Sequence, residues 1–476
     1  MTETPRVLLV TDSDSYVKWG AALANQLPKD WTVHLVLARG NAEPSPRQLS
    51  EALDGTRFDA DGVPRVGLRQ LRSLLDEWRP DVLVAATRGP AVQAMVSLIP
   101  NASDRPVVVS GLAGISVPVI GYGLGFRRAV DVFVVHSRRE LREFAQASIE
   151  RGIPHTYGLA TLPFLASAPR PAEPDSMRSV MVEVPVRNRI VFAGQAMVPA
   201  SRRERLWLLR QLIETARAHP ALEVVIKVRA REGEPQTHVE HYSYERLLVG
   251  LLSAGEHIPA NLVVESGAMS RHLRRAVGLV TVSSTALLEA IDEGIPALAL
   301  TDFGVGADQI NIVLMGSGLL GTARDLVDAE FRHPEPSWLD DNYFHDSSAN
   351  SWLARVEGLL ALRRTTGMPA YPELKNTSMN RVRAMLLRKF AFVPEQGTRR
   401  EVVESRLLAV GLWVNRHRGA LGVTFLRRRA GYGRKSVTPS AGGTEVRCRW
   451  LRAPSLRSTR GRVFPWRPRR QRRTAP

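Results

Sequence analysis

Three hydroxyl side chains stand together where an apolar segment of the chain gives way to a helical one. The strand-like run at 278–282 leads into Ser283, Ser284 and Thr285, and Glu289 follows about one helical turn later. Three hydroxyls at a helix start, with its free backbone N–H groups and its dipole, suit an anion such as a phosphate. Glu289 would then meet a sugar or ribose hydroxyl. The alternative is an ordinary helix cap at Ser284, with Glu289 as a surface acid.

A basic segment ends another apolar run. Residues 222–228 predict a strand, and Lys227, Arg229 and Arg231 alternate at its end. Side chains alternate between the two faces of an extended chain, so these three cations would share one face. At the end of an interior strand that face suits a pyrophosphate, whereas on an edge strand the same residues would be solvated charges.

Two acids follow the first predicted strand. Segment 11–19 reads Thr-Asp-Ser-Asp-Ser-Tyr-Val-Lys-Trp, which places Asp12 and Asp14 at the carboxyl end of that strand. A carboxylate in this position could act as the general base for an incoming hydroxyl. The alternative is an Asx or Ser cap that opens the next helix, which would use one acid and leave the other unexplained.

Other polar motifs predict no site. The glycine run at 121–125 lacks the spacing of a dinucleotide loop, so we reject a dinucleotide site there. His238 and His241 have metal-like spacing without a compelling third ligand, so we expect a polar loop and no metal site. His136 and His155 lie at strand ends, where local hydrogen bonds are expected to satisfy them.

Short β-branched runs alternate with helical patterns, which predicts parallel sheets covered on both faces. In the first half we expect strands at 6–10, 31–38, 81–86, 107–110 and 131–136. After a proline-rich stretch, strands resume at 189–193, 222–228, 261–264, 278–282 and 297–300. Ligands bind at the carboxyl ends of strands in such folds, so the three motifs described first lie where chemistry is expected.

The predicted fold is α/β, with two Rossmann-like domains facing across a cleft. Residues 1–165 form the first domain, 166–188 a Pro-rich hinge and 189–350 the second domain. Residues 351–426 are helical and basic, and residues 427–476 form an Arg-rich tail that cannot bury a core and is predicted to be disordered. The tail holds +15 of the net charge of +18, so the body is nearly balanced, which argues against a nucleic-acid partner for it.

Composition narrows the class of protein. Hydrophobic residues at 44% and charged residues at 24% are ordinary for a globular chain. The single cysteine, Cys448, excludes an internal disulfide framework and a cysteine-based zinc site, and it fits a reducing, cytoplasmic setting. We expect no secretory signal at the N-terminus. The uncharged run at 106–126 is long enough to span a bilayer, but its glycines and prolines favour a strand with loops.

Taken together, these motifs resemble those of GT-B glycosyltransferases. The resemblance rests on the two α/β halves, on Gly194 and Gln195 after the first strand of the second half, on the basic strand end, and on Ser-Ser-Thr-Ala-x-x-Glu-Ala with Gly294 and Pro296. The chain is more closely similar to a bacterial glycosyltransferase family of GT-B type that opens with Asp-Ser-Asp-Ser-Tyr-x-Lys-Trp, here residues 12–19. It is distantly similar to capsule polysaccharide and CDP-glycerol glycerophosphotransferases.

The resemblance implies a transferase that moves a sugar, or a sugar-like alditol phosphate, from a nucleotide-activated donor to a hydroxyl acceptor in cell-surface or other glycan synthesis. Asp12, Asp14 and Lys18 would be the catalytic residues facing a glycan or lipid-linked acceptor. The nucleotide sugar is a substrate, with no bound cofactor and no divalent metal in the chemical step. The residues implied to bind the donor are Gly194, Gln195, Lys227, Arg229, Ser283, Ser284, Thr285 and Glu289.

Two other functions stay open at this point. One is a nucleotide-sugar epimerase of the same fold, although the serine block lacks the Asp-Ser-Gly-Gly motif that such enzymes resemble. The other is a non-catalytic nucleotide- or glycan-binding protein, recruited by residues 380–476 to an anionic membrane surface through charge and an amphipathic segment at 381–390. The expected location is the cytoplasm, peripheral to the inner face of the cell membrane if the basic region binds lipid.

Overall fold

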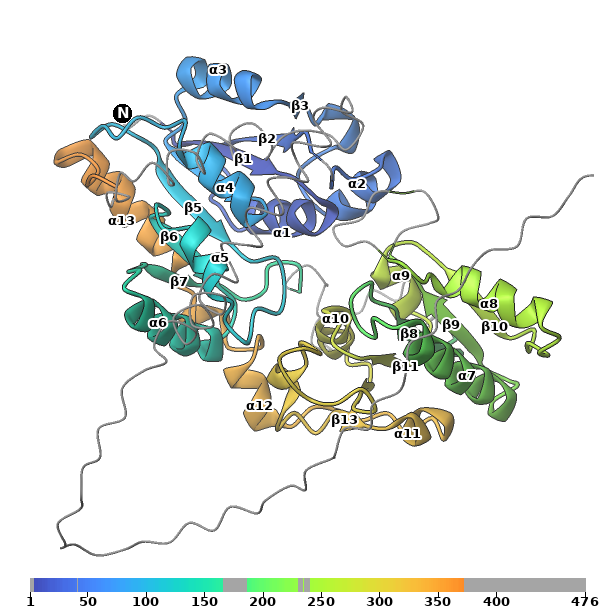
Figure 1. Ribbon diagram of the computed structural model, residues 1–476. Helices are drawn as coiled ribbons and strands as arrows, with labels where there is room; N and C mark the ends of the chain where they lie inside the picture. Colours follow the sequence, from blue (N-terminus) through green and yellow to red (C-terminus); the bar gives the residue numbers. More distant parts are fainter. Residues whose placement is uncertain (1–3, 41, 166–185, 230–233, 235–239, 372–476) are drawn as a thin grey trace, which may run out of the picture. The chain divides into compact units, whose positions relative to one another are not determined.

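Two parallel sheets with flanking helices organise the computed structural model of the chain (Figure 1). The structure describes residues 4–40, 42–165, 186–229, 234 and 240–371. The first sheet has seven strands and the second has six, and every paired strand in both sheets runs parallel. The predicted α/β class with two Rossmann-like sheets is therefore confirmed. The hinge residues 166–185, the helical region beyond 371 and the basic tail lie outside the described residues.

The first domain is the sheet with strand order β3-β2-β1-β4-β5-β6-β7 and its helices. Its strands are β1 (Arg6–Thr11), β2 (Thr32–Ala38), β3 (Arg65–Val66), β4 (Val82–Ala86), β5 (Val107–Gly111), β6 (Val132–Val135) and β7 (Tyr157–Leu159). Its helices are α1 (Asp14–Ala24), α2 (Pro46–Leu53), α3 (Leu68–Trp78), α4 (Gly89–Val96), α5 (Gly121–Phe126) and α6 (Arg138–Arg151), with a 3-10 turn at Ala60–Gly62. The five strands predicted in this half are present, and the two edge strands were not predicted.

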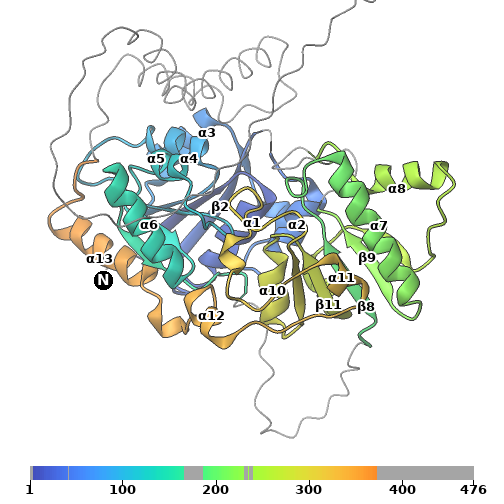
Figure 2. The same ribbon diagram turned by 60° about the horizontal axis from the view of Figure 1, so that its bottom comes forward.

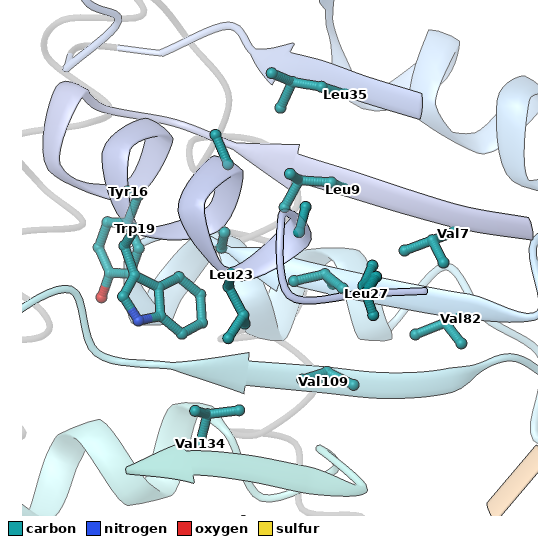
Figure 3. Close-up of a cluster of buried hydrophobic side chains, with 14 of the residues drawn as sticks. Val7, Leu9, Tyr16, Trp19, Leu23, Leu27, Leu35, Val82, Val109 and Val134 are labelled. Atoms are coloured by element: carbon teal, nitrogen blue, oxygen red, sulfur yellow. The ribbon is translucent and has the colours of Figure 1, made fainter. Parts of the chain in front are cut away.

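Apolar side chains of α1 pack onto this first sheet (Figure 3). Trp19 and Leu23 of α1 are buried with Leu9 of β1, Val109 of β5 and Val134 of β6. A fully buried Trp or Leu contributes roughly 1.5–3 kcal/mol through removal of its apolar surface from water. Helix α1 is therefore fixed to the sheet, and its first turn is held at the carboxyl end of β1.

The second domain is the sheet with strand order β10-β9-β8-β11-β12-β13 and its helices. Its strands are β8 (Arg189–Ala193), β9 (Glu223–Lys227), β10 (Leu262–Glu265), β11 (Ala276–Thr281), β12 (Ala297–Leu300) and β13 (Leu320–Gly321). Its helices are α7 (Arg202–Ala218), α8 (Tyr244–Ser253), α9 (Met269–Leu273), α10 (Ala286–Asp292) and α11 (Ala323–Val327), with a 3-10 turn at Ile312–Leu314. Strand β9 lies between β8 and β10, so the alternative of an edge strand for the basic segment is wrong.

After the second sheet the chain returns to the first domain. Helix α12 (Pro336–Asp341) contacts α6 (Figure 2), and a 3-10 turn follows at Ser347–Ala349. Helix α13 (Trp352–Thr365) contacts β5, β6 and β7 (Figure 1). Trp352, Val356 and Leu360 of α13 are buried in the same apolar cluster as Trp19. The first domain is thus completed by residues that follow the second domain in sequence.

One apolar cluster joins residues from both halves of the chain. Val117, in the loop after β5, and Leu162 and Leu165, just before the predicted hinge, are buried with the residues around α10 and β11. The loop after β5 therefore packs against the second domain as well as against the first. Residues near α10 are consequently held by apolar burial and not only by polar contacts.

The uncharged run at 106–126 forms strand β5, a loop and the short helix α5. The strand with loops that we expected in this run is present, and in addition the glycine-containing segment Gly121–Phe126 is helical. Among the residues that the structure describes, no helix is both long enough and apolar enough to cross a membrane.

Candidate functional site

Each sheet has one place where the strand order reverses direction, and polar side chains meet at both. In the first sheet this switch point lies between β1 and β4, and in the second it lies between β8 and β11. Ligands of open α/β sheets bind outside the carboxyl ends of the strands at such points. Asp12 follows β1 and Arg88 follows β4, whereas Gln195 follows β8 and Ser283 follows β11.

At the switch point of the second domain, uncharged side chains form a hydrogen-bond network. The Gln195 side-chain oxygen accepts from the Ser283 N–H at 2.9 Å, and the Gln195 amide nitrogen donates to the Ser283 Oγ at 3.2 Å. Gly194 N–H donates to the Lys227 carbonyl at 3.0 Å, which ties the loop after β8 to the end of β9. Gln195, Lys227 and Ser283, all predicted to bind the donor, therefore sit on neighbouring strand ends.

The hydroxyl block differs from the open anion site that we predicted. Helix α10 begins at Ala286, and its N-cap residue Thr285 makes no side-chain cap hydrogen bond. Ser284 N–H donates to Thr281 Oγ1 at 3.2 Å, and Ala286 N–H donates to Ser284 Oγ at 3.2 Å. Several backbone donors that we expected to be free are thus already used, because the turn folds onto its own hydroxyls.

Lys227 places a cation at this network. It is half-buried at the last position of β9, and within the described residues its ammonium has no recorded hydrogen bond or ion pair. Burial lowers the pKa of Lys227 to about 8, an effect that Arg229 and Lys18 reinforce and that Glu289 and Glu51 oppose. An ammonium without a partner at a switch point is available for an anionic ligand.

Four other predicted residues, two from α1 and two from the second domain, form two ion pairs. Arg229 grips Asp14 with two nitrogens, Nε to Oδ2 at 2.8 Å and Nη2 to Oδ1 at 2.5 Å, and Nη2 also donates to the Ser15 hydroxyl. Lys18 Nζ lies 2.8 Å from Glu289 Oε2. Burial raises the pKa of Asp14, but Arg229 outweighs it, so the net pKa is lowered. Asp14 therefore carries a stable charge and is a poor proton acceptor, unlike the general base that we considered.

Asp12 has a different environment. Its Oδ2 accepts from the backbone N–H of Arg88 at 3.2 Å and from Arg88 Nε at 2.8 Å, and only 2% of the residue is exposed. Its Oδ1 is buried and has no hydrogen-bond partner in the described structure, as is also true of Ser13 Oγ and Thr87 Oγ1. Ser13 is the N-cap of α1 without a side-chain cap bond, so the helix-cap alternative does not account for this segment. A buried polar atom without a partner is costly unless a ligand or water satisfies it.

Sequence reasoning missed the residue that shapes the loop after β8. Arg205 of α7 is 1% exposed, and its guanidinium donates to the carbonyls of Gln195, Ala196, Pro199 and Tyr242 and pairs with Glu240. One side chain thus fixes two segments that follow β8 and β9. Its position on the apolar face of an amphipathic helix was the only available signal, because an Arg there must find buried partners.

A glycine of the first domain approaches the hydroxyl block. Gly114, in the loop after β5, has a φ of +141°, and a Cβ there would lie 2.8 Å from Thr285 Cγ2. A side chain at position 114 would therefore clash and would also strain the backbone. No spacing or motif in the sequence marked this contact.

His136 behaves as a local structural residue, whereas both ring nitrogens of His155 are buried without a hydrogen-bond partner in the described structure, so the expectation for His155 is not met. His136 Nε2 accepts from Trp19 Nε1 at 2.7 Å, and its Nδ1 lies 3.1 Å from the Ala160 carbonyl, which fixes the proton on Nδ1. Burial lowers the pKa of His136 to about 4, so the ring is neutral. Ser137 caps helix α6 by accepting from the Glu140 N–H, and the buried carboxylate of Glu140 accepts from Ser116, His136 N–H and Tyr343 Oη.

No group of His, Cys, Asp and Glu suited to a metal ion occurs among the described residues. Arg231 and His238 lie outside the described residues.

The chain belongs to the family described as "Putative glycosyltransferase (DUF6716)", whose model matches residues 7–359. No curated protein matches the sequence. This family assignment agrees with the GT-B glycosyltransferase resemblance of the sequence. The distant similarity to CDP-glycerol glycerophosphotransferases stays a prediction.

Several solved structures match this chain over most of their own length. A "putative UDP-N-acetylglucosamine 2-epimerase" from Listeria monocytogenes has 12% identity and a TM-score of 0.49, covering 78% of this chain and 99% of its own. The UDP-GlcNAc 2-epimerase from Neisseria meningitidis bound to UDP-GlcNAc has 12% identity and a TM-score of 0.46, covering 75% and 98%. The glycotransferase of kitacinnamycin has 14% identity and a TM-score of 0.37, covering 77% and 96%.

Proposed function

We propose that this member of the glycosyltransferase family transfers a sugar, or a sugar-like alditol phosphate, from a nucleotide-activated donor to a hydroxyl acceptor. The second domain holds the donor phosphates at the switch point between β8 and β11. The first domain presents the acceptor, a glycan or a lipid-linked hydroxyl, at the switch point between β1 and β4. The donor is a substrate, so the reaction needs no bound cofactor.

The observation that carries this proposal is the ammonium of Lys227. It lies at the end of an interior strand beside the Gln195–Ser283 network, and within the described residues it has no ion-pair partner. The Gln195 amide and the Ser283 hydroxyl beside it can bind phosphate oxygens without repelling them, whereas Glu289 also acts on the Lys227 ammonium. A half-buried cation of this kind stabilises the negative charge that develops on a departing nucleotide.

In the transfer step, the acceptor oxygen forms a bond to the anomeric carbon of the sugar as the bond from that carbon to the phosphate oxygen breaks. The electron pair of the broken bond stays with the nucleotide phosphate, next to Lys227. The acceptor proton passes to the free Oδ1 of Asp12, whose Oδ2 is held by Arg88. Asp14 and Lys18 act as positioning residues, because both are engaged in ion pairs.

The first test is thermal unfolding of the full chain with UDP, GDP, CDP, CMP or ADP, each with and without Mg²⁺. A bound nucleotide at a hundred times its Kd stabilises the folded protein by about 2.7 kcal/mol. We expect one nucleotide to raise the midpoint, and to do so without Mg²⁺. Absence of a shift with every nucleotide at millimolar concentration would contradict the proposal.

A variant pair locates the binding. Lys227→Met is expected to weaken nucleotide binding by about tenfold to a hundredfold, the range for loss of a hydrogen bond to a charged group. Lys29→Met is the matched control, since Lys29 is exposed in the loop before β2. Equal effects of the two substitutions would place the nucleotide elsewhere.

A further inference from the structure

Arg229 holds Asp14 in the geometry that arginine uses for a phosphate. Two guanidinium nitrogens meet the two carboxylate oxygens, and the same Nη2 reaches the Ser15 hydroxyl. Such a two-pronged contact is the arrangement in which arginine recognises carboxylates and phosphates alike. Arg229 lies two residues beyond Lys227, the cation with no recorded partner in the described part of the chain.

A second ion pair, between Lys18 and Glu289, lies one helical turn further along α1. Asp14 and Lys18 are four residues apart on α1 and therefore share a face of that helix. Their partners, Arg229 and Glu289, carry the opposite charges and come from the second domain. The acidic and basic residues of α1 thus match a basic and an acidic residue at the candidate donor site.

We propose that Asp14 occupies the phosphate-binding fork of Arg229 in the ligand-free protein, so that a donor phosphate must displace this carboxylate in order to bind. This inference rests on the proposed function and adds a partner exchange to it. The phosphate takes the place of Asp14 on Arg229, and Asp14 is released to solvent. The exchange loosens the first turn of α1 from the second domain before the acceptor arrives.

The exposure of the pair makes such an exchange feasible. The side chains of Arg229 and Asp14 are 39% and 22% exposed. Ion pairs that are open to solvent are worth about 0.2–1 kcal/mol, so a diphosphate carrying more charge than one carboxylate can replace Asp14. Lys227 adds attraction for the incoming anion that Asp14 does not receive through a direct contact.

The test uses inorganic pyrophosphate, titrated calorimetrically into the full-length chain at fixed ionic strength. Asp14→Asn removes the competing carboxylate charge and is expected to tighten pyrophosphate binding by about twofold to fivefold, the equivalent of one exposed ion pair. In an Arg229→Gln background, Asp14→Asn is expected to change nothing. That comparison separates displacement at Arg229 from a general loss of negative charge, which would act in both backgrounds.

Asp76→Asn is the matched control, because Asp76 is an exposed acid paired with Arg72 within α3. It should leave pyrophosphate binding unchanged. Hydrogen exchange gives a second measurement that does not depend on a variant: pyrophosphate should increase exchange in the first turn of α1 in the wild-type chain. Unchanged affinity in Asp14→Asn, or an equal gain in the Arg229→Gln background, would overturn the inference.

The outcomes also separate this inference from the proposed function. If a nucleotide binds in a Lys227-dependent way while the Asp14 and Arg229 substitutions act independently, the donor site stands and the exchange is wrong. If no nucleotide binds, but pyrophosphate gains affinity in Asp14→Asn only when Arg229 is present, the exchange stands and the nucleotide donor is wrong.

Discussion

The two switch points of this molecule are built from opposite kinds of polar contact. In the first domain a carboxylate meets a guanidinium, Asp12 with Arg88 at 2.8 Å, and one carboxylate oxygen is left without a partner in the described structure. In the second domain an amide meets a hydroxyl, Gln195 with Ser283, and both ends of the amide are used. One switch point holds a buried charge, and the other holds a neutral network beside a cation.

This difference favours a division of chemical tasks. A buried carboxylate with a free oxygen can receive a proton but would repel a phosphate. A neutral network next to Lys227 can hold a phosphate but offers no proton acceptor. The predictions below test whether the first switch point serves turnover and the second serves binding.

The largest effect is expected at Asp12. Asp12→Asn removes the proton acceptor and should lower the transfer rate by about a hundredfold to ten-thousandfold, the usual range for general base catalysis. Nucleotide affinity, measured by thermal shift, should stay unchanged. Asp30→Asn, at an exposed acid, is the control for both measurements. Equal loss of binding and turnover would contradict the division of tasks, and unchanged turnover would show that Asp12 is not the proton acceptor.

Arg205→Lys tests the scaffold of the second switch point. Lysine cannot supply the five donors that reach Gln195, Ala196, Pro199, Tyr242 and Glu240. The buried acceptors left behind are expected to lower the free energy of unfolding by about 2–4 kcal/mol, measured in urea, and to weaken nucleotide binding. Arg203→Lys on the exposed face of α7 should change neither quantity. A stable variant with normal nucleotide affinity would show that the loop holds its shape without this residue.

The pH dependence of nucleotide binding tests Lys227. Its pKa of about 8 in the folded protein lies below the ordinary value of 10.5, so the protonated form is lost as the pH rises through 8. Nucleotide affinity should be constant below about pH 7 and should fall by up to about tenfold per pH unit above pH 8. Lys227→Arg keeps its charge throughout and should flatten this decline. A decline that persists in Lys227→Arg would assign the titration to another group.

The smallest effect is expected at the hydrogen bond between Trp19 of α1 and His136 in the core of the first domain. The pKa of His136 is about 4 in the folded protein and 6.5 for the free group. Between these values the unfolded chain binds a proton that the folded protein does not, so the free energy of unfolding is highest above pH 6.5 and decreases as the pH falls toward 4. Trp19→Phe removes the donor to Nε2 and should lower the free energy of unfolding by about 1 kcal/mol at pH 7.5. Nucleotide affinity should not change, and a large loss of affinity would link this core contact to the donor site.

Much of the fold could be predicted because buried parallel strands appear in the sequence as short apolar runs. The predicted strand at 297–300 coincides with β12, and that at 189–193 coincides with β8. The missed strands β3, β7 and β13 have only two or three residues each, too few for a pattern to show. Helix α5 was missed because glycine is a poor helix former, and here tertiary packing overrides that preference.

The residue types of the site were predictable, but their partners were not. Asp14, Lys18, Arg229 and Glu289 all stand out as charges after strands or on the following helix. Nothing in their spacing says that they neutralise one another, since each pair spans more than 200 residues of chain. The same reason hides Gly114, whose close contact is with Thr285 of the second domain. Arg205 contacts residues nearer in sequence, but no spacing pattern marks an arginine that binds the backbone carbonyls of a loop.

The return of α13 to the first domain bears on how the protein is made. The core around Trp19 also contains Val356 and Leu360, so it cannot be completed when only the first 165 residues have left the ribosome. The second domain's sheet and helices, by contrast, lie in one continuous stretch from Arg189 to Val327, although Trp338 and Tyr343 are also buried in its apolar cluster. Domains generally fold in the order of synthesis, but here the half that begins first has to wait for its final helix. During that interval the apolar surface that α13 will cover is open to chaperones.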